Sequence, residues 1–316
     1  MTGTAGSPSA GEGSPASRPK EPPANEAGIF TNRSDPGSGC LDARAIRAFE
    51  PDAKIALLAT VDDGGLPRVT LITSLAAKDA TTLTFGQFCE GQSKRNLPLR
   101  PQAAFLVMTP DRRLWSGRAR WRGRARSGED YEAYNRRPMF RYNAYFGIHT
   151  VHYLDVVSVS PSERVLVVPL VLGAARRAMA ARLPRRRRRQ GHALSRWAMR
   201  FLAAPSTLAF AAFVGEDGWP SIVPLVHAVA TGPDRLAVGI TGRGRPLKAL
   251  RAGHPLAVFA LNLRMESILV RGRLETARGL PGLRYRPLPV DWVYNSMPPK
   301  QGVVYPRARL RPVEQF

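Results

Sequence analysis

Gln92, Ser93 and Lys94 are the clearest group of residues that could carry chemistry, because a hydroxyl and an ammonium follow one another at the start of a predicted short helix. The backbone N–H groups at a helix N-terminus bind anions, and a neighbouring lysine adds a full positive charge. The Ser93 hydroxyl, these N–H groups and the Lys94 ammonium could therefore converge on one phosphate. A second interpretation stays open, in which Ser93 is only the N-cap of the helix.

Aromatic and hydrogen-bonding residues also gather in two segments that each carry a Tyr-Asn pair. The first segment contains Tyr142, Asn143, Tyr145, Phe146, His149 and His152, and the second contains Asn295, Lys300, Gln301 and Tyr305. Such residues suit the rim of a pocket that orients a planar ligand, and they equally suit an aromatic plug at the end of a barrel.

His149 and His152 form an H-x-x-H pair, which raises the question of a metal site. On a strand, a separation of three residues places the two rings on opposite faces, and no cysteine or carboxylate pair nearby completes a tetrahedral set. Cys89 has no identifiable histidine partner, so the sequence shows no hydrolase constellation either. We therefore expect no metal, and we assign no catalytic residue.

The elements that must position these residues are short strands joined by hairpin turns, with few helices. We expect strands at Ile55–Val61, Arg68–Leu75, Thr82–Gln87, Ala103–Thr109, Arg113–Arg122 and His149–Val159, and helices at Leu41–Phe49, Ser93–Leu99 and Glu129–Arg141. Asp62, Asp63, Gly64 and Gly65 have the composition of a hairpin turn. Many short strands with one helix after the third strand predict a small β-barrel rather than a parallel βαβ fold.

The chain then repeats this pattern at a nearly constant offset, which is the signature of a tandem duplication. The run from Ala56 to Thr73 is matched by Leu208–Val226, Leu83–Gly86 by Leu236–Gly239, Lys94 by Lys248, and Gly117 by Gly272. Tyr142 and Asn143 precede Tyr153 with the spacing by which Tyr294 and Asn295 precede Tyr305. We therefore expect two diverged copies of one β-rich domain, copy one and copy two.

Composition divides the chain into four parts. We expect a disordered segment over residues 1–35, copy one over residues 36–170, a helical, arginine-rich linker over residues 171–205, and copy two over residues 206–316. The first part is rich in Gly, Ser, Pro, Ala and Glu and has almost nothing to bury. The linker contains the run Arg185–Arg189, followed by a helix over Ala193–Phe201. Copy two ends in the Pro- and Gly-rich stretch Leu280–Asp291 and a tail strand over Val303–Arg311.

The net charge of the 316 residues is +23, which invites a nucleic-acid interpretation. Because the excess is almost entirely arginine spread along the chain, we expect a generally basic surface and no specific nucleic-acid partner. Arg185–Arg189 is typical of a solvated linker, and contact with an anionic membrane is its alternative. Two cysteines, no apolar leader and no membrane-spanning stretch favour the cytoplasm.

The ordered series of strand, D-G turn, Pro, strand, S-K-x-N-L helix and G-R-A strand resembles the pyridoxamine 5′-phosphate oxidase-like family. The likeness covers Ile55–Arg122 well and Ala212–Glu275 more loosely. It implies a mainly β fold with some α, the FMN-binding split β-barrel. In that family two barrels usually pack as a homodimer with flavin between them. The resemblance therefore implies two tandem split-barrel domains packed as an intramolecular pseudo-dimer, either monomeric or itself a homodimer.

The same resemblance implies which residues of copy one hold the cofactor. They are Thr70, Leu71, Ile72, Thr73, Phe85, Gly86, Gln92, Ser93 and Lys94. The strand Thr70–Thr73 would line the ring and phosphate, while Phe85 and Gly86 would lie beneath the ring. A glycine at position 86 would let a ligand approach the backbone closely. The lysine falls one position later than is usual in the family.

The two copies differ in polarity at these places. Copy one has Thr70, Thr73, Thr84, Gln87 and Ser93 where copy two has Val223, Val226, Ala237, Ile240 and Leu247. We therefore expect one principal flavin per chain, although Arg243, Arg245 and Lys248 keep a second phosphate site open. The leading hypothesis is an FMN-dependent oxidoreductase. The alternatives are an F420-dependent reductase of the same fold, and a non-enzymatic flavin- or haem-binding or basic interaction protein.

Overall fold

The computed structural model describes residues 39–50, 52–88, 91–137, 147–164, 192–225, 227–239, 247, 249–278, 284–295 and 302–306. Residues 34–316 form one compact unit that contains two β-sheets. Several residues named above lie outside the described ranges: Cys89, Tyr142, Asn143, Tyr145, Phe146, Arg185–Arg189, Val226, Ile240, Arg243, Arg245, Lys248, Lys300 and Gln301. Residues 1–35 and most of the linker also lie outside them.

The elements of copy one follow the predicted order. They are α1 (Ala43–Phe49), β1 (Ile55–Val61), β2 (Pro67–Leu71), β3 (Ala76–Ala77), β4 (Thr82–Gln87), α2 (Gln92–Leu99), β5 (Gln102–Met108), β6 (Arg113–Ala125), α3 (Glu129–Arg136), β7 (Thr150–Val159) and β8 (Glu163–Arg164).

Copy two replays this series. Its elements are α6 (Arg196–Ala203), β9 (Leu208–Val214), β10 (Pro220–Leu225), β11 (Ala228–Gly232), β12 (Arg235–Gly239), β13 (Pro255–Leu261), β14 (Ser267–Arg273), β15 (Tyr285–Asn295) and β16 (Gly302–Tyr305).

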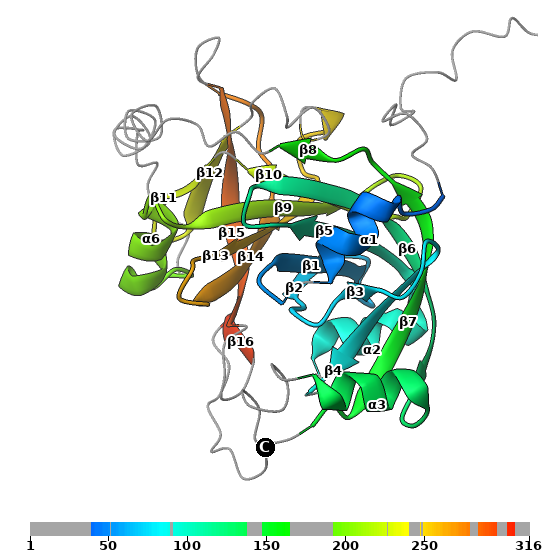
Figure 1. Ribbon diagram of the computed structural model, residues 1–316. Helices are drawn as coiled ribbons and strands as arrows, with labels where there is room; N and C mark the ends of the chain where they lie inside the picture. The colour runs from blue at the N-terminus through cyan, green and yellow to red at the C-terminus, as the bar shows by residue number, and fades with distance from the viewer. Residues whose placement is uncertain are drawn as a thin grey trace, which may run out of the picture. The chain divides into compact units, whose positions relative to one another are not determined.

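The two sheets have the same strand order. It is β2-β1-β5-β6-β7-β4-β3 in the first sheet and β10-β9-β13-β14-β15-β12-β11 in the second (Figure 1). The remaining strand differs, because β8 pairs with β6 whereas β16 pairs with β15. The chain is therefore two tandem split β-barrels, as the sequence predicted. We call them barrel one (α1 to β8) and barrel two (α6 to β16).

Equivalent capped helices precede the first strand of each barrel, and the sequence comparison had not matched them. Asp42 caps α1 by accepting a backbone N–H at 2.6 Å, and Ser195 caps α6 in the same way at 3.1 Å. The preceding residues, Leu41 and Leu194, are buried, and each donates its N–H to a carbonyl of its own barrel at 2.7 Å. An N-cap contributes about 1 kcal/mol. The duplication thus includes the helix as well as the strands.

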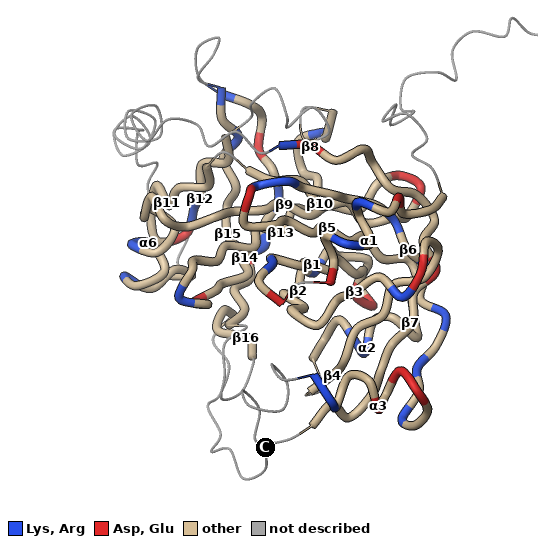
Figure 2. Tube along the Cα trace, in the orientation of Figure 1, with Lys and Arg blue, Asp and Glu red and all other residues tan. Residues whose placement is uncertain are grey.

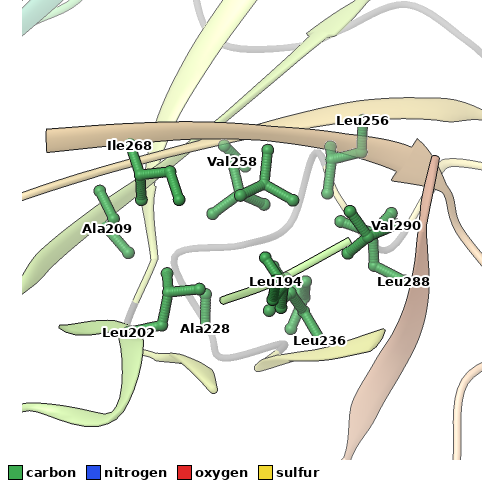
Figure 3. Close-up of a cluster of buried hydrophobic side chains, with 14 of the residues drawn as sticks. Leu194, Leu202, Ala209, Ala228, Leu236, Leu256, Val258, Ile268, Leu288 and Val290 are labelled. Carbon is green, nitrogen blue, oxygen red and sulfur yellow. The ribbon is translucent and has the colours of Figure 1, made fainter. Parts of the chain in front are cut away.

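Each barrel has its own apolar core, and a third core joins the two barrels. Phe49 of α1 and Phe105 lie in the core of barrel one, while Leu194 and Leu202 pack on Val258 and Ile268 in barrel two (Figure 3). The third core joins side chains of both barrels: Leu57, Ala59, Val69, Ala104, Leu106, Met108 and Leu114 with Phe210, Ala212, Ile222, Ala257, Phe259, Leu261, Leu269, Trp292 and Tyr294. Burial of such side chains is worth about 1.5–3 kcal/mol each. The shared core is what makes the tandem an intramolecular pseudo-dimer.

Several sequence-based element bounds of copy one were wrong in detail. Helix α3 ends at Arg136 instead of Arg141, and β6 continues to Ala125 instead of Arg122. The second strand ends at Leu71 instead of Leu75. The Ser74 hydroxyl donates to the carbonyl of Gly86 and accepts from its N–H, which directs the chain away from the line of β2. Helix α2 begins one residue earlier than expected, and its N-cap is Gly91. Ser93 is therefore a buried residue of the first helical turn, not the cap.

The equivalence proposed for the two Tyr-Asn segments is also wrong. Leu83 pairs with Leu154 of β7, and its counterpart Leu236 pairs with Leu288 of β15. This register makes β15 the counterpart of β7, so Tyr294 does not correspond to Tyr142. The offset changes because residues 126–149 join β6 to β7, whereas the shorter stretch 274–284 joins β14 to β15.

Strand β15 was not predicted, because its first half contains two prolines. Pro287 and Pro289 lie opposite residues of β12, but they do not have to donate a hydrogen bond to that strand. The neighbouring residue Val290 does donate, from its N–H to the carbonyl of Asp234 at 2.8 Å. The nitrogen atoms of the two prolines face the side of β14. They leave no ladder hydrogen bond unmade, because the pairing of β15 with β14 begins only at Val290. Proline is compatible with a strand where that side carries no ladder.

Charged residues are distributed over both barrels. In the view of Figure 2, basic and acidic residues are seen on elements of both barrels. Within the described residues, no helix is long and apolar enough to cross a membrane.

Candidate functional site

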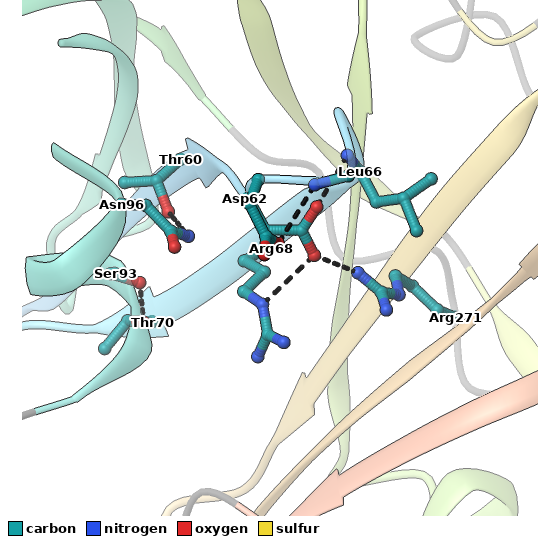
Figure 4. Close-up of polar contacts among 10 residues, drawn as sticks. Thr60, Asp62, Leu66, Arg68, Thr70, Ser93, Asn96 and Arg271 are labelled. Carbon is teal, nitrogen blue, oxygen red and sulfur yellow. Dashed lines mark hydrogen bonds and ion pairs between the residues drawn. The ribbon is translucent and has the colours of Figure 1, made fainter. Parts of the chain in front are cut away.

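The hairpin turn between β1 and β2 places a buried ion cluster between the barrels. Asp62 Oδ2 accepts from Nη1 of Arg271, on β14, at 2.6 Å, and from Nε of Arg68, on β2, at 3.4 Å (Figure 4). Asp62 Oδ1 accepts the N–H of Leu66 at 2.9 Å, which holds the carboxylate in its own turn. The three charged side chains are between 8% and 11% exposed.

Trp292 and Tyr294 of β15 complete this cluster, which we call junction one. Their rings stack at 5.4 Å, and the Arg68 guanidinium lies over both, 4.7 Å from the Trp292 centroid and 5.6 Å from that of Tyr294. Arg271 lies 4.3 Å from the Trp292 ring. Cation–π contacts with these rings help to hold both guanidinium groups in place.

Junction one has more positive charge than its one carboxylate balances. Burial, and then the charge of Arg271, lower the pKa of Arg68, although an arginine stays protonated in proteins. Nη1 of Arg68 is buried and has no hydrogen-bond partner among the described residues. Leaving a buried donor unpaired costs about 1–3 kcal/mol. An anion placed at Nη1 would both satisfy the donor and offset the charge.

Strand β2 connects junction one to the start of α2. Arg68 and Thr70 alternate along the strand and so share a face. The Thr70 hydroxyl is hydrogen-bonded to that of Ser93, and Asn96 one turn later donates to Thr60 at 3.1 Å (Figure 4). The structure thus brings together Thr70 and Ser93, two of the predicted site residues, and Thr70 is on the face of β2 that also carries Arg68.

Gln92 and Lys94, the neighbours of Ser93, are half-buried on the first turn of α2. Lys94 and Arg124 are close enough to His152 that their charges lower its pKa, after the larger effect of burial. The cationic side chains of Lys94 and Arg124 therefore lie near His152, on the adjoining wall of the barrel.

That wall is a fixed network around His152. Trp121 Nε1 donates to His152 Nδ1 at 3.2 Å, so the other ring nitrogen carries the proton and donates to Gln87 at 2.7 Å. Phe85 stacks on the imidazole at 4.6 Å with an interplanar angle of 3°. Burial lowers the pKa of His152 to about 3, which keeps the ring neutral near pH 7. His152 is a structural residue here, and no cluster of metal-ligating groups occurs among the described residues.

The side chains of the remaining predicted site residues are buried or half-buried in the protein. Phe85 and Ile72 are buried in the core of barrel one, and Leu71 packs toward the core between the barrels, while Thr73 lies half-buried in the turn after β2. A Cβ at Gly86 would come within 2.0 Å of Ile148 Cδ1. The glycine therefore accommodates Ile148, which is a different reason from the ligand approach expected from the sequence.

Barrel two has apolar side chains at the corresponding positions. Val223 and Leu247 pack in its core where barrel one has Thr70 and Ser93. Ser221 follows Pro220 of β10 as Arg68 follows Pro67 of β2, so no guanidinium is present there. The polar groups of Thr84 and Gln87, which copy two also lacks, are used inside barrel one by Tyr134 and His152.

A second contact between the barrels involves the turn between β9 and β10, and we call it junction two. Asp217 accepts from Nη1 of Arg118, on β6, at 2.7 Å, and Trp219 lies beneath Arg118 and Arg120 at 5.6 and 5.4 Å. Its ion pair is more exposed, at 26% for Arg118 and 48% for Asp217. The Asp217 carboxylate is paired with Arg118, and among the described residues no second arginine shares it.

Arg68 and Arg271 are the candidate site residues that the sequence interpretation missed. The two-residue alternation of a strand could have identified Arg68, since it places Arg68 on the same face as Thr70. Nothing in the local sequence indicates Arg271, because its position depends on how barrel two packs on barrel one.

Comparison with known proteins gives one family match. Residues 43–170 match the family model described as pyridoxamine 5′-phosphate oxidase. No curated protein matches the chain. An FMN-binding protein from Syntrophomonas wolfei subsp. wolfei is 16% identical with a TM-score of 0.34, over 39% of this chain and 85% of that one. An FAD-binding protein from Mesorhizobium loti is 16% identical with a TM-score of 0.29, over 40% and 97%. An F420 reductase is 21% identical with a TM-score of 0.30, over 36% and 94%.

Proposed function

Because residues 43–170 belong to the pyridoxamine 5′-phosphate oxidase family, we propose that the chain is a flavin-dependent oxidoreductase that binds FMN at junction one. The observation that carries this proposal is the buried, unpaired Nη1 of Arg68, on the face of β2 that also carries Thr70 of the Thr70–Ser93 pair. A phosphate dianion needs several donors and a local excess of positive charge. Junction one and the first turn of α2 offer both.

The residues divide into two roles. Arg68, Ser93 and Lys94 would hold the phosphate, with Thr70 fixing the orientation of the Ser93 hydroxyl. The main chain of Thr70–Thr73 would lie along the ring edge, since Leu71 and Ile72 direct their side chains into packing. When bound, the flavin would supply hydride or electron transfer, and the protein would supply position and electrostatic environment.

One site per chain follows from the difference between the copies. The apolar residues Val223 and Leu247 leave barrel two without the hydroxyl pair, and Ser221 leaves it without the guanidinium. We therefore propose a stoichiometry of one FMN for each chain.

The first test is the absorbance spectrum of the purified chain and the amount of cofactor released on denaturation. We expect a flavin spectrum and close to one equivalent of FMN. Two equivalents would contradict the single site, a shorter-wavelength chromophore would indicate F420, and a Soret band would indicate haem. A colourless chain that does not bind added FMN would overturn the proposal.

A matched pair of variants locates the site. Arg68→Gln should weaken FMN binding about a hundredfold, because it removes a charge-assisted contact from a buried position. Arg118→Gln makes the same change at junction two and should leave affinity unchanged. Equal effects of the two variants would contradict the assignment to junction one.

A further inference from the structure

Exposed apolar side chains are concentrated at one end of barrel two. Among the described residues, six of the eight exposed large hydrophobic side chains lie there: Trp197, Leu208, Leu263, Met265, Val303 and Val304. The other two, Leu99 and Val157, belong to barrel one. Leu263 is 89% exposed and Met265 is 55% exposed. Contiguous exposed apolar surface of this kind marks an interaction site, and we call these six residues the apolar end.

Three elements bring these residues together. Trp197 of α6 and Val304 of β16 line one recess of about 210 Å³ with Ser267, which directly follows the hairpin tip that carries Leu263 and Met265. Leu208 pairs with Leu261 at the base of the same hairpin. In Figure 1 the tip between β13 and β14 lies next to α6.

The apolar end is also basic. Arg196 and Arg200 on α6 and Arg264 at the hairpin tip are exposed between the apolar side chains. The one acidic residue at the tip, Glu266, accepts a hydrogen bond from Asn262 at 2.7 Å. Residues 192–207 contain no acidic residue, and Arg185–Arg189 end three positions before residue 192 in the sequence.

From this combination we propose that the apolar end docks the protein on an anionic lipid bilayer. Tryptophan and leucine enter the interface between headgroups and acyl chains, while arginines beside them bind anionic headgroups. Trp197 is suited to this role because its ring is held by stacking on Phe201 at 5.0 Å while 40% of it stays exposed. Two copies of the apolar end facing each other would bring two basic surfaces together, so like-charge repulsion disfavours self-association.

Co-sedimentation with vesicles tests the proposal. The full chain should bind phosphatidylcholine vesicles that contain phosphatidylglycerol, and it should stay in solution with pure phosphatidylcholine. Leu263→Ser should weaken binding about tenfold, since burying a leucine is worth about 1.5–3 kcal/mol. Leu99→Ser is the matched control, because Leu99 is 71% exposed on barrel one, and it should bind as the unmodified chain does.

Two further variants separate the proposal from its competitors. Trp197→Ser should weaken vesicle binding, as Leu263→Ser does. Replacing Arg185–Arg189 by serines should also weaken vesicle binding, but by less than the change to pure phosphatidylcholine vesicles. Failure to bind either vesicle, or loss of binding only on removal of the arginine run, would overturn the proposal. Light scattering that shows a dimer dissociated by Leu263→Ser would overturn it in favour of self-association.

Discussion

The two junctions between the barrels start from the same architecture and end in different chemistry. Each uses the turn between the first two strands of one barrel, and the glycines Gly65 and Gly218 have the same φ of 75° in those turns. At junction one the turn carboxylate is buried between two arginines, and one buried N–H is left unpaired. At junction two a half-exposed carboxylate is paired with Arg118. The fold therefore supplies two related turns, and their side chains give the two junctions different burial and charge balance.

Replacing Asp62 by alanine should have the largest effect on this comparison. It would leave two buried guanidinium groups without a carboxylate, and breaking a buried pair in this way costs about 3 kcal/mol. Asp217→Ala removes an exposed pair and should cost less than about 1 kcal/mol. Urea denaturation of both variants measures the difference. Equal losses of unfolding free energy in the two variants would show that the burial of Asp62 does not make junction one more important for stability than junction two.

Acid should destabilise barrel one through His152, whose structural counterpart in barrel two is Arg286. The pKa of His152 is lowered from 6.5 to about 3, so the unfolded chain takes up a proton below pH 6.5 while the folded chain does not. Stability is therefore lost as the pH falls from about 6.5 toward 3, by about 2–3 kcal/mol at pH 4.5. The pH dependence of unfolding should flatten in His152→Gln. An unchanged slope would contradict the neutral, buried imidazole.

A threonine–valine exchange tests the difference between the barrels at the proposed cofactor site. Thr70→Val gives barrel one the residue of barrel two and should weaken FMN binding about tenfold, because the Ser93 hydroxyl loses the partner that orients it. Val223→Thr makes the reverse change and should create no second site, because the guanidinium is still missing there. Fluorimetric titration with FMN gives both affinities. A second equivalent bound by Val223→Thr would show that the hydroxyl alone limits barrel two.

The capped helices should respond alike, since there the two barrels have kept the same chemistry. Asp42→Ala and Ser195→Ala each remove one side-chain acceptor from a helix N-terminus and should each cost about 1 kcal/mol. Thermal unfolding followed by circular dichroism measures both. A loss confined to one variant would show that only one cap contributes to stability.

The strands could be predicted from sequence because the two-residue alternation and the D-G turns are local signals. β1 and β4 match their predicted bounds. The predicted match of Leu83 to Leu236 agrees with the strand pairing, because each of the two residues pairs with a leucine of the corresponding strand. Strand β15 was missed because Pro287 is tolerated only through a pairing that the sequence does not show. The equivalence of the two Tyr-Asn segments was wrong because the connection between β14 and β15 is shorter than that between β6 and β7. The matching residue spacing did not reveal this difference.

The candidate site was predictable only on the side that barrel one supplies. Thr70 and Ser93 were identified together by resemblance, and the structure places their hydroxyl groups in contact. Arg271 could not be found, because its contact with Asp62 joins residues far apart in sequence and exists only through the shared core.

Two sheets of identical strand order on one chain also have a genetic consequence. In a homodimer each codon is expressed on both sides of the axis, so an arginine that improves one cleft alters the other as well. After fusion each side has its own codons, and selection can refine one cleft while the other drifts toward packing. The serine at position 221 and the valine at position 223 are what such independent drift would leave behind.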